Sequence, residues 1–154
     1  IALQALDSAM CKLSWLPNWT IGIALLIVAV QAADRREPFK LLHVHPASGW
    51  PGEIVTIHTD VWRDTSRRCA VGVYRSFSDS AGWRWDYAPA YFSADAIRET
   101  ESKTPGRMSP SFLIPPSAAP GPAAISTSLH YRCNKVHAIW PVEINHTLPL
   151  RVLP

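Results

Sequence analysis

The stretch Leu41–Ile57, LLHVHPASGWPGEIVTI, decides the fold of this chain. Two apolar runs flank a cluster in which Gly49 and Gly52 bracket Trp50 and Pro51. Alternation of apolar and polar residues is typical of half-buried strands, whereas glycine and proline favour tight turns. The stretch therefore predicts two strands joined by a tight connection, in which both glycines adopt a left-handed φ.

The same alternation continues beyond this stretch and predicts which side chains are buried. A second strand is expected over Glu53–Trp62, and every other residue of it belongs to one face. Leu129 and Tyr131 alternate in the same way with His130 and Arg132. The face that we expect in the core of the second strand consists of Val55, Ile57, Thr59 and Val61.

Strand-like segments recur through the rest of the chain, separated by clusters of turn-forming residues. The chain contains 14 prolines, which disfavour long helices. We expect all-β architecture, an antiparallel sandwich of about seven strands, with one helical turn within 94–102. The predicted strands are Phe39–His45, Glu53–Trp62, Cys69–Phe77, Trp83–Phe92, Ser109–Ile114, Ala123–Arg132 and Val142–Val152.

Residues 1–33 are predicted to be a signal peptide or a transmembrane anchor, apart from a domain at 38–154. Residues 13–33 carry no charge, and an apolar run of Ile21–Val30 follows Lys12. A cleavage after Ala32 with the start at Met10 fits an export signal, and the uncharged length also fits a membrane anchor. A buried core helix is the third reading of this segment.

The stretch quoted above resembles the opening of the IPT/TIG immunoglobulin-like domains. Their first two strands read approximately I-x-x-V-x-P-x-S-G-x-x-G-x-x-V-T-I, and the run FLIPPSAAPGPAAI at 112–125 resembles the family's approach to its penultimate strand. The positions that carry the first match are Val44, Pro46, Ser48, Gly49, Gly52, Val55, Thr56 and Ile57. The resemblance covers most of 39–130 and implies an immunoglobulin-like sandwich. It implies no particular ligand, and residues 63–108 depart from the family.

Two of the three cysteines lie inside the predicted domain. In an immunoglobulin-like order, Cys69 opens the third strand and Cys133 ends the sixth, and these strands are antiparallel neighbours. The resemblance thus implies a Cys69–Cys133 disulfide, which an extracytoplasmic location would permit. Two buried free thiols are the alternative.

Three histidines form a candidate metal site. His43 and His45 are two residues apart on the first strand, and His58 is on the next strand. Imidazole ligands suit copper or zinc, and a weaker resemblance runs to small periplasmic copper-binding sandwiches. Polar side chains on a solvated sheet face are the alternative reading, in which the chain has no cofactor.

Three aromatic residues alternate in the segment WRWDYAPAYF. Trp83, Trp85 and Tyr87 therefore point to one side of a strand, with Arg84 and Asp86 on the other. Exposed, they would form a platform for a sugar or a protein. Buried, Trp85 and Tyr87 would belong to the core, where aromatic side chains contribute large apolar areas.

Charge and motifs narrow the function classes. The net charge is +3 and the basic residues are scattered, which argues against nucleic-acid binding. The sequence contains no nucleophile elbow, phosphate loop, zinc-protease or dinucleotide motif, so we expect no enzyme. The leading hypothesis is a non-catalytic, extracytoplasmic module that docks protein or glycan, with membrane contact through 13–33 if that segment is uncleaved. The alternatives are a copper- or zinc-binding periplasmic protein and a component of a surface or phage assembly.

Overall fold

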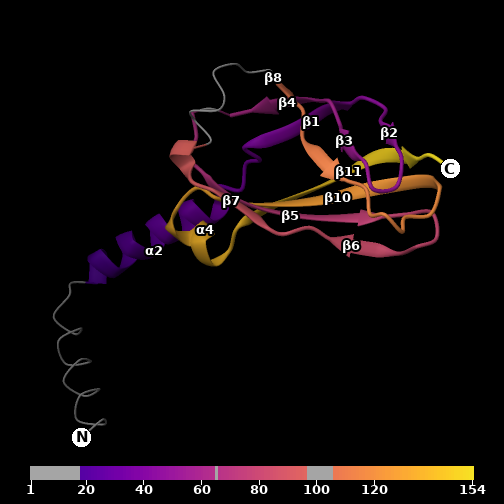
Figure 1. The fold of residues 1–154 in the computed structure, drawn as a ribbon. Helices are drawn as coiled ribbons and strands as arrows, with labels where there is room; N and C mark the ends of the chain where they lie inside the picture. The colour runs from indigo at the N-terminus through magenta and orange to yellow at the C-terminus, as the bar shows by residue number, and fades with distance from the viewer. Residues whose placement is uncertain (1–17, 65, 97–105) are drawn as a thin grey trace, which may run out of the picture. The chain divides into compact units, whose positions relative to one another are not determined.

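The fold is described from a computed structural model, which covers residues 18–64, 66–96 and 106–154 (Figure 1). The chain divides into two compact units, residues 1–35 and residues 36–154.

The first unit contains helix α2, Asn18–Ala33. Its large apolar side chains, such as Trp19, Leu25 and Leu26, are mostly exposed. The apolar side chains of the helix are distributed around its whole circumference. It therefore has no polar face of the kind that surface helices of globular domains present. None of the helices in the described ranges is long and apolar enough to cross a membrane.

The second unit is built from β-strands, as the alternation predicted, with one short helix. Strands β1, β4 and β8 lie on one side of the unit, and β5, β6 and β10 lie on the other (Figure 1). The elements are β1 Phe39–Val44, β2 Ser48–Gly49, β3 Ile54–Thr56, β4 Thr59–Arg63, β5 Ala70–Ser78, β6 Arg84–Asp86, β7 Ala90–Phe92, β8 Gly106–Met108, β9 Ser111–Leu113, β10 Gly121–Arg132, α4 Lys135–Ile139 and β11 Val142–Val152.

One side consists of strands β1, β3, β4, β8 and β9. β1 pairs antiparallel with β4, β4 with β8, and β3 with β9. The β3–β9 and β4–β8 ladders share one register, and between them the Ile57 N–H donates to the Pro110 carbonyl at 3.0 Å. Pro110 has no N–H to return. The segment predicted as one strand, Glu53–Trp62, is therefore divided in two.

The other side is a larger sheet with the order β2-β11-β10-β5-β6, and β7 also pairs with β5. The β10–β11 hairpin is its longest ladder, running from Gly121 opposite Val152 to Tyr131 opposite Val142. All pairs are antiparallel except β2 with β11, which are parallel. β6 and β7 are one predicted strand, Trp83–Phe92, interrupted where Pro89 cannot donate to the ladder.

The two sides share a core, and the alternation predicted its members correctly. Val55, Ile57, Thr59 and Val61 are all buried, and so are Leu129 and Tyr131. The core falls into two clusters. One cluster contains Ile57, Phe77, Ile114, Ile125 and Val152, and the other contains Phe39, Val61, Val73, Tyr131 and Ile144.

Local predictions outside the strands had mixed outcomes. Gly52 has a φ of +83°, as expected, but Gly49 does not have a positive φ. A Cβ on Gly49 would lie 3.0 Å from Ile114 Cδ1, so close packing is what requires glycine there. The helix α4 was missed; the Asn134 side chain caps it by accepting from the His137 N–H. The turn predicted at 94–102 lies mostly outside the described residues.

Candidate functional site

The outer face of the larger sheet carries a polar groove of about 600 Å³. Strand alternation directs every second residue of β5, β10 and β11 to this face. The ladder registers then align these residues in rows that cross the strands. One row is Asp86, Ser76, Ser126 and Thr147, and the next is Tyr74, Ser128 and Asn145.

The two rows consist mainly of polar side chains. Hydroxyl, amide and carboxylate groups line them, and directly opposed residues in a ladder are about 4.5–5.5 Å apart. Asn145 and Thr147 are exposed on β11, and Ser126 is exposed on β10. The groove therefore presents both hydrogen-bond donors and acceptors at short, regular spacing.

An aromatic cluster adjoins the groove, and Tyr74 is its member in the groove lining. The Tyr74 and Tyr91 hydroxyls lie 3.1 Å apart, and the His130 ring centroid lies 4.8 Å from that of Tyr74. His130 also lies 3.1 Å from the Ser128 hydroxyl through Nε2. Tyr74 is 39% exposed and Tyr91 is 61% exposed, so both rings present surface to solvent.

Gly72 leaves room for the two tyrosine rings of this cluster. A Cβ at this position would come 3.3 Å from the Tyr91 ring and 3.4 Å from the Tyr74 ring. The hydrogen bond with Tyr91 raises the pKa of the Tyr74 hydroxyl. Two charged residues of the groove lining, Arg84 and Asp86 on β6, pair with each other at 3.2 Å.

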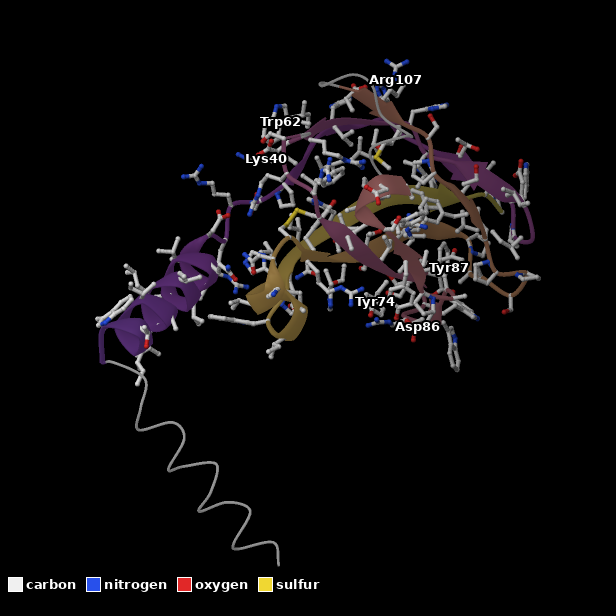
Figure 2. All side chains as sticks on the ribbon, turned by 90° about the vertical axis from the view of Figure 1, so that its left-hand side faces the viewer. Lys40, Trp62, Tyr74, Asp86, Tyr87 and Arg107 are labelled. Carbon is white, nitrogen blue, oxygen red and sulfur yellow. A yellow bond between two sulfur atoms is a disulfide. The ribbon has the colours of Figure 1, made fainter. Side chains whose placement is uncertain are left out.

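Figure 2 shows Tyr74 and Asp86 on the opposite side of this unit from Lys40, Trp62 and Arg107. The latter three lie on the strands of the smaller side. There Lys40 lies over the Trp62 ring at 5.9 Å, and Arg107 bonds Asp60 at 3.3 Å. The hydrogen bond from Arg107 is the main cause that lowers the pKa of Asp60.

The aromatic residues expected to act together are separated. Trp83 is 69% exposed in the β5–β6 connection. Trp85 and Tyr87 are half buried and pack against Phe77 and Phe112, respectively, with centroids 5.7 and 6.0 Å apart. The Tyr87 hydroxyl donates to the Leu113 carbonyl at 2.8 Å. The trio does not form one exposed platform.

The three histidines lie on neighbouring strands but turn to different partners. The His43 and His45 ring centroids are 4.8 Å apart. His45 Nε2 lies 3.1 Å from Asp60 Oδ2, and His58 Nδ1 lies 2.7 Å from Ser109 Oγ. In the described part of the chain, no three His, Cys, Asp or Glu side chains are grouped to hold a metal ion. Copper or zinc binding here stays a prediction from the sequence.

Cys69 and Cys133 lie at disulfide distance, with sulfur atoms 2.03 Å apart. Ala70 faces Arg132 in the β5–β10 ladder, so the two cysteines are the next opposed pair beyond it. The bridge joins the ends of two neighbouring strands of the larger sheet, at the same end of that sheet as α4.

The outer groove was missed by the sequence reading. Its residues come from four strands, and only the registers bring them into rows. The available signal was the polar character of every second residue in Ser126–Thr127–Ser128 and Asn145–His146–Thr147.

Comparisons with known proteins leave the family open. No protein-family model matches this chain, and no curated protein matches it. Among solved structures, the chain is similar to the sporulation control protein Spo0M from Bacillus subtilis, with 12% identity and a TM-score of 0.43, over 77% of this chain and 51% of that chain.

A second solved structure is the Pseudomonas fluorescens alkylpurine DNA glycosylase AlkC bound to DNA containing an abasic site analog. It shares 9% identity with a TM-score of 0.33, over 75% of this chain and 31% of that chain. This chain thus matches about half of the first protein's length and under a third of the second's. Neither likeness carries an argument about what this chain does.

Proposed function

We propose that this chain is a non-catalytic, extracytoplasmic, immunoglobulin-like domain that binds carbohydrate through the outer groove of its larger sheet. The observation that carries the proposal is the pair of polar rows ending at the Tyr74–Tyr91 cluster. The hydroxyl, amide and carboxylate groups of the rows can exchange hydrogen bonds with sugar hydroxyls. The exposed tyrosine rings offer flat apolar surface to the C–H face of a pyranose.

The polarity of the groove favours carbohydrate over protein. The centres of protein–protein interfaces are depleted in charge and enriched in large apolar and aromatic side chains. Here the groove is lined by Ser126, Ser128, Asn145 and Thr147, as well as by Tyr74 and Tyr87. A protein partner would leave many of these polar groups desolvated without matching partners.

The strand order supports the immunoglobulin-like class. In that fold, the first, second and fifth strands form part of one sheet, and the last strands neighbour the third in the other. Correspondingly, β1 and β4 pair with β8 here, while β11, β10, β5 and β6 follow one another in the larger sheet. The quoted IPT/TIG-like stretch occupies the matching first two strands.

The disulfide supports a location outside the cytoplasm. Disulfides persist in oxidising compartments and are rare where thiols are kept reduced. The uncharged apolar segment before residue 34 agrees with export, either as a signal or as an anchor.

Glycan-array screening of the purified chain, followed by calorimetric titration of the best oligosaccharide, tests the proposal. Tyr74→Ala and Asn145→Ala are expected to weaken binding at least tenfold. Trp83→Ala is the matched control, because it removes a more exposed aromatic ring that does not line the groove.

Two results would overturn the proposal. The first is the absence of binding to any glycan on the array. The second is binding that Trp83→Ala abolishes and Tyr74→Ala leaves intact, which would move the site to the β5–β6 connection. Specific binding of a protein, lost in Tyr74→Ala, would replace carbohydrate as the occupant.

A further inference from the structure

A cavity of about 190 Å³ lies between the two sides of the domain. It is partly enclosed, and it is lined by residues of both core clusters, for example Leu148 and Phe112 of one, and Val73 and Leu129 of the other. Its walls are mainly apolar. The cavity lies on the inner face of the larger sheet, and Arg75, Thr127 and His146 belong to the lining of both this cavity and the outer groove.

Three polar side chains cross the inner face of the larger sheet in one row. Arg75 faces Thr127 in the β5–β10 ladder, and Thr127 faces His146 in the β10–β11 ladder. All three line the cavity. Each occupies a position that alternation gives to the core, since apolar residues flank it two positions away on either side: Val73 and Phe77, Ile125 and Leu129, Ile144 and Leu148.

Each member of this row has a buried polar atom without a partner. Arg75 Nε, Thr127 Oγ1 and His146 Nε2 make no hydrogen bond in the described structure. A buried polar atom left unsatisfied costs about 1–3 kcal/mol, and native proteins contain few of them. Three in one row, all against one cavity, indicate that something else supplies the partners.

The charge of the cavity identifies the kind of partner. Arg75 lies over the Phe112 ring at 5.4 Å, and the His146 ring centroid lies 5.5 Å from that of Phe39. Arg63 adds a second guanidinium from β4. No Asp or Glu is among the described residues that line the cavity.

Burial changes the pKa of both titratable groups in the row. Burial lowers the pKa of the Arg75 guanidinium, and it also lowers the pKa of His146, where Glu37 acts in the opposite direction. An anion in the cavity would compensate the buried positive charge.

We propose that this cavity binds a small monocarboxylate with an apolar body, of about the size of benzoate. The carboxylate would accept from Arg75, Thr127 and His146, and charge-assisted bonds of this kind are the strong ones. The apolar body would pack among side chains such as Val73, Leu129 and Met108. An apolar cavity of about 150 Å³ in another protein binds benzene, so this volume suits one ring or a short alkyl chain.

Calorimetric titration of the full, oxidised chain with sodium benzoate tests the proposal, with benzamide as the uncharged probe of the same shape. We expect saturable binding of benzoate and at least tenfold weaker binding of benzamide. Arg75→Gln should weaken benzoate binding at least tenfold. Arg151→Gln, at an exposed position of β11, is the matched control and should bind as the original chain does.

Should Arg75→Gln fail to fold, the original chain and Thr127→Val keep the proposal testable. Benzoate should shift the imidazole NMR signals of His146 and leave those of His130, on the outer face, in place. Thr127→Val should weaken binding severalfold. No benzoate binding at millimolar concentration, equal binding of benzamide, or shifts confined to His130 would each overturn the proposal.

Discussion

At the scale of single residues, the carboxylate of Asp79 joins two connections through backbone hydrogen bonds. It accepts hydrogen bonds from the N–H groups of Ala81, Trp83 and Ala119, at 3.0, 2.9 and 2.8 Å. The first two lie in its own β5–β6 connection, and the third lies in the segment before β10. One side chain therefore holds two connections together at one end of the larger sheet.

Asp79→Asn is expected to lower the thermal unfolding midpoint by about 4–8 °C at neutral pH. The hydrogen bond from Ala119 is the main cause that lowers the pKa of Asp79 below its ordinary value of 3.8. A depressed folded-state pKa stabilises the fold above that ordinary value, and the stabilisation disappears as the pH falls through the folded-state pKa.

Calorimetric melting of both chains from pH 7 down to pH 2 checks this, and the gap between them should close at the acid end. Asp86→Asn is the control, because Asp86 is exposed and bonds only Arg84. A gap that is absent at pH 7, or equal for both variants, would contradict the role of Asp79.

The burial of single residues could be predicted from the sequence where the alternation within one strand was sufficient. Val55, Ile57, Thr59 and Val61 are buried because alternation within a strand fixes its inner face. Arg75 occupies an inner position by the same rule, but its charge conceals this. The sequence pattern does not mark His146, because only the register of β10 with both neighbours places it in a row with Thr127 and Arg75.

At the scale of elements, the disulfide joins the ends of two neighbouring strands of the larger sheet. Cys69 precedes β5 and Cys133 follows β10, and 64 residues separate them in sequence. Closing a chain segment of this length restricts the unfolded ensemble far more than the folded one.

Replacing both cysteines, Cys69→Ala and Cys133→Ala, should lower the free energy of unfolding by about 4 kcal/mol. Urea unfolding followed by tryptophan fluorescence measures this. A reductant should destabilise the original chain by a similar amount and leave the double variant unchanged. Equal urea midpoints for the original chain with and without reductant would show that the bridge does not form or does not stabilise.

Element boundaries could be predicted only in part. The seven expected strands are recognisable in the structure, but Pro89 and Pro110 interrupt two of the ladders. These interruptions could not be predicted, because a proline in a strand can also lie at a sheet edge without interrupting a ladder. Helix α4 has only five residues, too few for a periodic signal. Its capping residue, Asn134, was the available sign.

At the scale of the whole domain, the two faces of the larger sheet have different chemistry at the same place along the strands. The outer face has two rows of polar groups beside a tyrosine pair, whereas the inner face has the row of Arg75, Thr127 and His146 between apolar clusters. Adjacent residues of a strand point to opposite faces. Ser126 and Ser128 therefore belong to the outer face, whereas the Thr127 side chain between them belongs to the inner row.

Carbohydrate binding at the outer groove is the central claim, and a backbone-amide NMR titration of the isotope-labelled chain with the best array glycan tests it most directly. We predict that the largest shifts fall on Tyr74, Ser126, Ser128, Asn145 and Thr147, with small shifts on β1, β4 and β8. Shifts centred on the smaller side, or no saturable shift with any glycan, would contradict the account.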